Sequence, residues 1–195
     1  MSLPLSRAEA WDLFREWTES DSLRRHVLAV EAAMRAYAGR FDEDEEYWGQ
    51  VGLLHDLDYE RHPSPEDGHP RHGMAELERL GYPPEFVRAV ASHADYLEVP
   101  RRTRLEHTLY GVDELSGFIA ACAYVRPAGI HGLTPKSVKK KLKQPSFAAA
   151  IDRDAVRASA DEMGMEFDEH VAFVIAALEE RAAELGLEGA GQGAA

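Results

Sequence analysis

The chain has 195 residues, of which 45% are hydrophobic and 29% are charged, a composition that suits one globular domain with a sizeable core. The formal net charge of -13 argues against general nucleic-acid binding, which needs a large positive surface, but it does not exclude small phosphorylated partners. No apolar run approaches the roughly 20 residues of a membrane span, and the N-terminus lacks the features of a signal peptide. We therefore expect a cytoplasmic protein without a membrane partner. Cys122 is the only cysteine, so no intramolecular disulfide is expected.

Helix signals begin close to the N-terminus. Ser6 and Glu9 form the pattern of a capping box before a first amphipathic helix. A second helix begins at Asp21 or Ser22, because apolar residues then recur at spacings of three and four. His26 lies beside that apolar stripe, so we expect it to point inward or to lie at the edge of the core.

A third helix carries an unusual pair of polar residues near its end. The acidic run 42–46 suits a helix N-terminus, and the following apolar stretch reaches His55 and Asp56 before the helix stops near Asp58. A buried carboxylate without a partner is costly, and a metal ion is the partner that suits an imidazole beside a carboxylate. The segment 61–70, rich in Pro, Asp, Gly and His, is expected to form a loop that exposes side chains to a cleft.

The rest of the chain continues the helical pattern. We expect helices over residues 71–80, 84–93, 105–125, 136–143, 154–163 and 168–185. No segment shows sustained two-residue alternation, so the predicted fold is all-α, a single-domain helical bundle. We expect an N-terminal helix packed on the core (1–21), a metal-binding core (22–126), a C-terminal extension of the same domain (127–186) and a flexible tail (187–195).

Inward-leaning polar residues lie at the ends or buried sides of several expected helices, which can aim them at one point. They are His26, His55, Asp56, His69 or His72, His93 and Asp113. The order of a lone His, a His-Asp doublet and a distant Asp resembles the HD-domain superfamily of metal-dependent phosphohydrolases. The resemblance covers residues 22–125. Within it, His69-Pro70-Arg71-His72-Gly73 is similar to the His-Pro-x-x-Gly segment of the binuclear branch.

The resemblance implies a ligand set. A first metal ion would be held by His26, His55, Asp56 and Asp113, and a second by His69 and His93, with Asp56 bridging the two. His72 is the alternative to His69, and Asp58 could orient a ligating His, cap the helix end or lie in solvent. Asp56 and Asp113 are the residues that we assign to catalysis.

The resemblance also implies a reaction. Mixed imidazole and carboxylate ligands suit one or two divalent ions of Mn, Fe, Co or Ni, and Mg or Zn stay open. A bound ion lowers the pKa of its water and polarises a phosphoryl oxygen. We therefore expect metal-activated hydroxide to cleave the phosphate ester of a small molecule, in particular a nucleotide.

Two other functions stay open. Some HD relatives are di-iron oxygenases with the same ligand order, and a non-catalytic regulatory or ligand-binding domain could contain the metal. The chain departs from cyclic-dinucleotide-cleaving relatives, since it has His93-Ala94 where they have His-His and Tyr59 where they have Lys. These two departures argue against the cleavage of cyclic dinucleotides. The oligomeric state is not indicated.

A lysine-rich segment over 136–143 stands out in so acidic a chain. Lys136, Lys140 and Lys143, together with Arg126, could bind a substrate phosphate, or the segment could be a solvated helix face. Four other histidines lack a similar constellation and are expected at the surface: His62, His107, His131 and His170.

Overall fold

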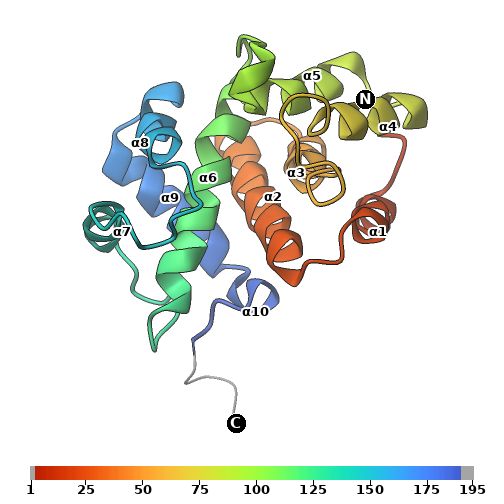
Figure 1. The fold of residues 1–195 in the computed structure, drawn as a ribbon. Coiled ribbons are helices and arrows are strands. Elements are labelled where there is room, and N and C mark those ends of the chain that lie inside the picture. The colour runs from red at the N-terminus through yellow and green to blue at the C-terminus, as the bar shows by residue number, and fades with distance from the viewer. Residues whose placement is uncertain (1–2, 190–195) are drawn as a thin grey trace. The chain divides into compact units, whose positions relative to one another are not determined.

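The computed structural model describes residues 3–189. In this range the regular structure consists of ten α-helices and one 3-10 helix without a strand, which confirms the expected all-α fold (Figure 1). None of these helices is both long enough and apolar enough to cross a membrane. The packing divides the chain into two compact units, residues 1–109 and 110–195. The boundary between these units falls within helix α6, and the expected extent of the metal-binding core, residues 22–126, stays a prediction.

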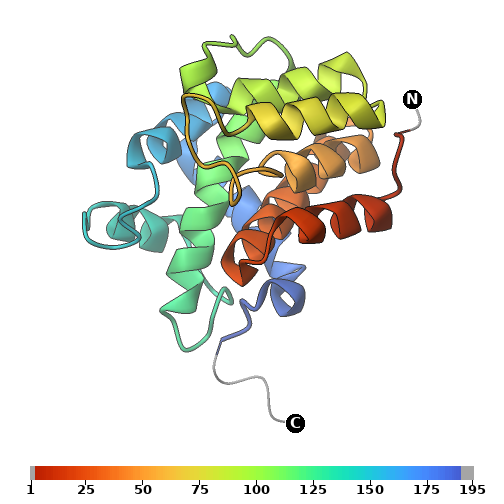
Figure 2. The same cartoon turned by 45° about the vertical axis from the view of Figure 1, so that its right-hand side comes forward.

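The first unit contains five helices, a 3-10 helix and the start of α6. Their bounds are α1 Arg7–Trp17, α2 Asp21–Phe41, α3 Glu45–Leu54, α4 Arg71–Leu80, α5 Pro84–His93, η1 Asp95–Leu97 and α6 Arg104–Tyr124. Helix α3 packs on α1, α2 and α5, and α4 lies beside α5 (Figures 1 and 2). The central position of α3 explains why every residue from Trp48 to its end at Leu54 is buried. The helix that leads into the His-Asp doublet is therefore largely enclosed.

Helices α2 and α3 approach each other closely at Gly52. A Cβ atom at this position would lie 2.9 Å from Cγ of Met34 and 3.1 Å from Cα of Glu31, so glycine is needed for this contact. Helix α3 then ends at Leu54. The expected continuation towards Asp58 is wrong, because the chain passes from Leu54 into a series of turns, and the doublet stands at the helix end.

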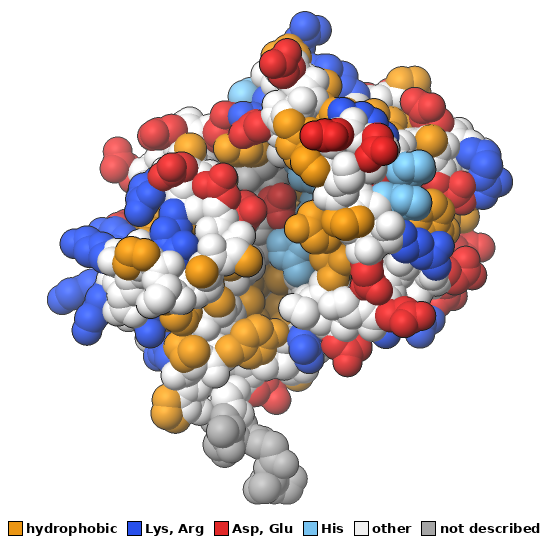
Figure 3. Space-filling view, in the orientation of Figure 1, with side chains coloured by type: hydrophobic (Ala, Val, Ile, Leu, Met, Phe, Trp, Pro, Cys, Tyr) orange, Lys and Arg blue, Asp and Glu red, His pale blue; other side chains and the backbone are white. Residues whose placement is uncertain are grey.

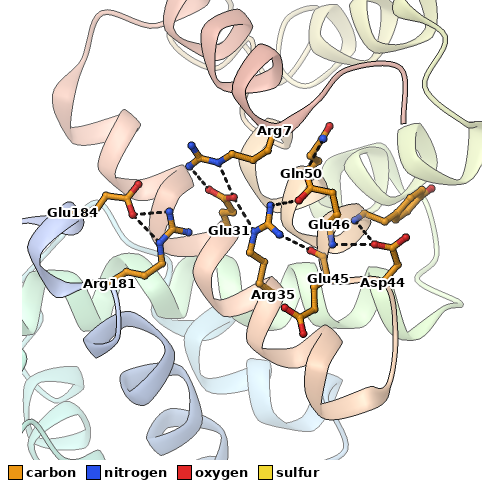
Figure 4. A network of polar contacts seen from close by, with 10 residues as sticks. Arg7, Glu31, Arg35, Asp44, Glu45, Glu46, Gln50, Arg181 and Glu184 are labelled. Atoms are coloured by element: carbon orange, nitrogen blue, oxygen red, sulfur yellow. Dashed lines mark hydrogen bonds and ion pairs between the residues drawn. The ribbon is translucent and has the colours of Figure 1, made fainter. Parts of the chain in front are cut away.

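A buried ion-pair network joins the first three helices (Figure 4). Glu31 on α2 is 1% exposed and accepts hydrogen bonds from Arg7 on α1, at 3.1 and 2.8 Å, and from Arg35, at 2.9 Å. Arg35 also donates to Glu46 of α3 at 2.8 Å. Because two guanidinium groups compensate its charge, the Glu31 carboxylate can stay buried and hold the three helices together.

The second unit consists of the rest of α6 and four further helices. They are α7 Pro135–Leu142, α8 Arg153–Glu162, α9 Phe167–Glu179 and α10 Ala182–Leu185. Helices α7, α8 and α10 pack on α9. The single helix expected over 168–185 is wrong, because the backbone of Arg181, at φ -114° and ψ 22°, leaves the helical region. The chain restarts as α10, which allows Leu185 to be buried.

Two residues of the second unit are more enclosed than the sequence indicated. His170, expected at the surface, is fully buried on α9, where Nε2 lies 2.9 Å from the carbonyl oxygen of Gly111. Leu187, at the start of the expected tail, is 1% exposed, and its carbonyl accepts a hydrogen bond from the amide of Ile130 at 2.8 Å. Residues 190–195 of that tail lie outside the described residues.

Candidate metal centre

The His-Asp doublet begins where α3 ends. The Nδ1 atom of His55 lies 2.8 Å from the carbonyl oxygen of Gly52. Because a carbonyl only accepts, Nδ1 carries the proton, and the Nε2 lone pair is directed towards Oδ1 of Asp56 at 3.5 Å. His55 is 1% exposed and Asp56 is 8% exposed. The doublet is therefore a buried imidazole held against a buried carboxylate.

Two further histidines approach the same carboxylate oxygen. His93, the last residue of α5, directs Nδ1 to the carbonyl of Val90 and has Nε2 3.6 Å from Oδ1 of Asp56. His69, in the loop before α4, directs Nδ1 to Oδ1 of Asp58 at 2.8 Å and has Nε2 3.4 Å from Oδ1 of Asp56. In each case an acceptor fixes the proton on Nδ1, so the Nε2 lone pairs converge on Asp56.

Asp58 is the acceptor that orients His69. Its side chain is fully buried, and Oδ2 accepts a hydrogen bond from the amide of Gly73 at 2.7 Å. Burial opposes ionisation of this carboxyl, but the hydrogen bonds from His69 and Gly73 outweigh burial and hold its pKa below the ordinary value. Asp58 therefore stays a carboxylate, which keeps the proton of His69 on Nδ1.

His26 completes the ring of imidazoles from α2. Its Nε2 lies 3.7 Å from Oδ2 of Asp56, and its ring meets that of His55 edge-on, with centroids 5.5 Å apart. The side chain of His26 is 22% exposed, which makes it the most exposed of the four imidazoles. One carboxylate thus faces four imidazoles, three through Oδ1 and one through Oδ2.

The distance between the Nε2 atoms of His69 and His93 indicates whether this cluster suits a cation. Their Nε2 atoms lie 3.1 Å apart, and both Nδ1 atoms are used as donors, so two lone pairs face each other. A cation relieves this repulsion. With metal–nitrogen distances of about 2.0–2.1 Å, two imidazoles on one ion are separated by roughly 3–3.4 Å, which matches the observed spacing.

The wider surroundings also favour a positive ion. Ligand atoms of His55, Asp56 and His93 all lie within 4.8 Å of one another. Helices α3 and α5 both end at the cluster, and helix C-termini carry partial negative charge on their carbonyl groups. The buried His and Asp residues of the first unit therefore fit a divalent metal ion.

The remaining predicted ligands differ in where the structure places them. His72 is exposed and stacks on His62 with ring centroids 3.9 Å apart, so His69 is the member of the alternative pair that approaches Asp56. Asp113 is partly buried on α6, in the second unit. Its assignment as a ligand and as a catalytic residue stays a prediction.

The predicted phosphate-binding residues all belong to the second unit. Lys136, Lys140 and Lys143 are exposed, and their spacing of four and three residues aligns them along α7, where Figure 3 shows Lys and Arg side chains gathered. Arg126 instead donates to the carbonyls of Gly129, at 2.6 Å, and His131, at 3.1 Å, and so stabilises the turn after α6. Phosphate binding by these four residues stays a prediction.

Two tyrosines beside the cluster were given no functional role from the sequence. The ring of Tyr59 meets the ring of His69 nearly perpendicularly, at 84°, with centroids 5.1 Å apart. The hydroxyl of Tyr96 donates to the carbonyl oxygen of His69 at 2.8 Å, and burial together with the charge of Asp56 raises the pKa of Tyr96. Their positions, shortly after the doublet and shortly after His93, are the signal that could have indicated them.

Comparison with known families agrees with this geometry. The HD domain family model matches residues 23–117, a range that contains every predicted metal ligand. The chain therefore belongs to the HD-domain superfamily, whose members are generally metal-dependent phosphohydrolases. Searches of curated proteins and of solved structures each gave no match.

Proposed function

We propose that this protein is a metal-dependent phosphohydrolase that cleaves the phosphate ester of a small molecule, with nucleotides as the substrate class. The observation that supports the proposal best is the arrangement around Asp56. Imidazole Nε2 atoms lie 3.4 to 3.7 Å from its carboxylate and are distributed over both oxygens. His55, His69 and His93 face Oδ1 and His26 faces Oδ2, so both oxygens of this carboxylate have imidazole neighbours that would share the binding of a metal ion.

The residues behind the imidazoles prepare the site for this chemistry. A bound divalent ion would polarise a phosphoryl oxygen and lower the pKa of a water molecule, which are the two requirements of ester hydrolysis. The carbonyls of Gly52 and Val90 and the carboxylate of Asp58 hold three imidazoles with Nε2 towards Asp56. The donors therefore need little rearrangement to bind an ion.

The donor set also suggests which ions to test. Imidazole and carboxylate ligands together suit Mn²⁺, Fe²⁺, Co²⁺ and Ni²⁺, whereas Mg²⁺ prefers oxygen ligands. We expect the first group to support turnover better than Mg²⁺.

Substitution of the central carboxylate tests the proposal. Asp56→Ala removes the group that all four imidazoles face, so both the metal content and the hydrolysis of a phosphoester panel should be lost. Metal content is measured by mass spectrometry of the purified protein, and turnover by phosphate release with each ion. The matched control is Asp67→Ala, because Asp67 is an exposed carboxylate in the loop that precedes His69. Full activity of a metal-free Asp56→Ala protein would contradict the proposal.

A di-iron oxygenase is the second candidate. The observation that favours it is the close pair of His69 and His93, with Nε2 atoms 3.1 Å apart, because such a centre needs ligands for a second ion. The two reactions differ in their use of oxygen. Turnover under strictly anaerobic conditions excludes the oxygenase, and oxygen consumption coupled to product formation excludes simple hydrolysis.

A further inference from the structure

We infer that Tyr59 and Tyr96 form an aromatic binding surface beside the metal centre, which selects phosphate esters that carry a planar aromatic group over aliphatic ones. The inference rests on the proposed function and assigns its substrate selectivity to two residues.

The first observation is where the exposed aromatic rings lie. Among residues 3–189, the exposed large hydrophobic side chains are Tyr59, Tyr96, Tyr124 and Val125. The two in the first unit are each 47% exposed, and both contact His69. A single exposed tyrosine is unremarkable in a folded protein. Two of them, from different segments of the chain, contact one histidine of the metal cluster: Tyr59 at its ring and Tyr96 at its backbone carbonyl.

The second observation is that each ring is held in place. Tyr96 belongs to η1 and is anchored by its hydroxyl, which donates to the carbonyl of His69 at 2.8 Å. Tyr59 packs against the imidazole of His69, with ring centroids 5.1 Å apart. A side chain that is already ordered loses less conformational entropy when a ligand binds, so these rings are better prepared for stacking than freely rotating surface tyrosines.

The location then determines the chemistry that the surface can recognise. A phosphate held at the cluster places the rest of the ester near His69, where the two phenol rings offer apolar faces. Aromatic rings stack on such faces through dispersion and quadrupole interactions. A saturated ring of the same size has no π-system and therefore lacks the quadrupole interaction. Stacking of one base on a protein aromatic side chain strengthens binding by about fivefold or more.

A matched pair of non-hydrolysable ligands tests the inference without turnover. Phenylphosphonate and cyclohexylphosphonate carry the same charged group and differ in the aromaticity of the ring. Their dissociation constants for the Mn²⁺-loaded protein are measured by calorimetry. We expect the wild-type protein to prefer phenylphosphonate, and Tyr59→Leu and Tyr96→Leu each to reduce that preference by about fivefold.

Two conservative variants and one control separate stacking from indirect effects. Tyr59→Phe and Tyr96→Phe keep the rings and should keep the preference, although Tyr96→Phe removes the hydrogen bond to His69. Tyr124→Leu removes a tyrosine that is 52% exposed and donates to the carbonyl of Leu185, and this variant should leave the preference unchanged. Metal content and melting temperature must match the wild type in every variant.

The outcomes distinguish this inference from the proposed function. Equal affinity of the wild-type protein for both phosphonates, or an unchanged preference in both leucine variants, overturns the aromatic surface. Loss of the preference in Tyr96→Phe overturns the stacking role of Tyr96, since the hydrogen bond would then be the cause. If the preference follows the rings but no phosphoester is hydrolysed, the aromatic surface stands and the hydrolase proposal fails.

Discussion

The contact between Asp58 and His69 allows a sharp test of how the site is organised. In Asp58→Asn, a carboxamide replaces a fully buried carboxylate that accepts from Nδ1 of His69 at 2.8 Å and from the amide of Gly73 at 2.7 Å. A carboxamide has one accepting atom, so it cannot satisfy both donors. The substitution preserves the shape of the side chain and changes its charge and its hydrogen bonding.

The magnitude follows from the two arrangements open to the amide. If its oxygen stays on Gly73, its NH₂ group faces His69, which must accept at Nδ1 and carry its proton on Nε2, where it no longer offers a lone pair. If the oxygen stays on His69, the NH₂ group faces another donor, at a cost of about 1–3 kcal/mol. Removal of such a carboxylate behind a metal-bound histidine lowers metal affinity by about 10–100-fold. We expect this loss for the ion near His69 and His93.

Metal titration of the Asp58→Asn protein measures the effect. Calorimetry with Mn²⁺ or Co²⁺ gives the affinity and the number of ions, and thermal unfolding shows whether the variant is folded. Asp67→Asn is the control for a lost charge, because Asp67 is an exposed carboxylate in the loop that precedes His69. A folded Asp58→Asn protein with wild-type affinity and stoichiometry would refute the argument that Asp58 prepares His69 for a metal ion.

Three further predictions concern stability and reactivity. Gly52→Ala should lower the free energy of unfolding, measured by urea denaturation, by about 1–3 kcal/mol, because the added Cβ would lie 2.9 Å from Cγ of Met34. Gly39→Ala is the control, since its Cβ would meet only the end of the Glu45 side chain, and it should leave the stability nearly unchanged. Glu31→Ala leaves Arg7 and Arg35 without their shared carboxylate, but both guanidinium groups are partly exposed and Arg35 keeps Glu46, so the free energy of unfolding should fall by about 1–3 kcal/mol; the absence of a loss measurable by urea denaturation contradicts this. Burial raises the pKa of Cys122 to about 12, so at pH 8 the thiol should react with a thiol reagent only after unfolding, and rapid labelling of the folded protein contradicts its burial. Since the ordinary pKa is 9.0, the stability that this shift contributes is complete below pH 9.0 and is lost as the pH rises towards about 12.

The helices that the sequence predicted best are those with explicit end signals. Helices α4 and α5 have the expected bounds because Gly81 adopts φ 86° as the cap of α4 and Pro84 opens α5. The end of α3 was misplaced, because the apolar pattern continues to Leu57 after the helical hydrogen bonds stop. The break at Arg181 was missed, since the segment contains neither Gly nor Pro before Gly186. Periodicity alone therefore identifies a buried face but not the residue at which the backbone turns.

The metal cluster was easier to predict than its surroundings. The order of a lone His, a His-Asp doublet and later histidines identified residues that the structure brings together in the first unit. The choice between His69 and His72 depended on a single spacing to Gly73, whereas in the structure it depends on Asp58, whose carboxylate meets both His69 and Gly73. That contact spans eleven residues and has no local pattern. The same holds for Tyr96, whose hydroxyl reaches a carbonyl in a distant loop.

Two of the histidines owe their orientation to the way in which helices end. His55 stands at the C-cap of α3 and His93 at the last position of α5, and each directs Nδ1 to the carbonyl three residues before it. The last carbonyls of a helix lack helical partners, so this contact satisfies an acceptor and fixes the imidazole tautomer at once. His69 lies in a loop without such a carbonyl and depends on the side chain of Asp58 instead. A single substitution can therefore remove the support of His69, whereas the support of His55 and His93 belongs to the backbone and persists while α3 and α5 remain folded.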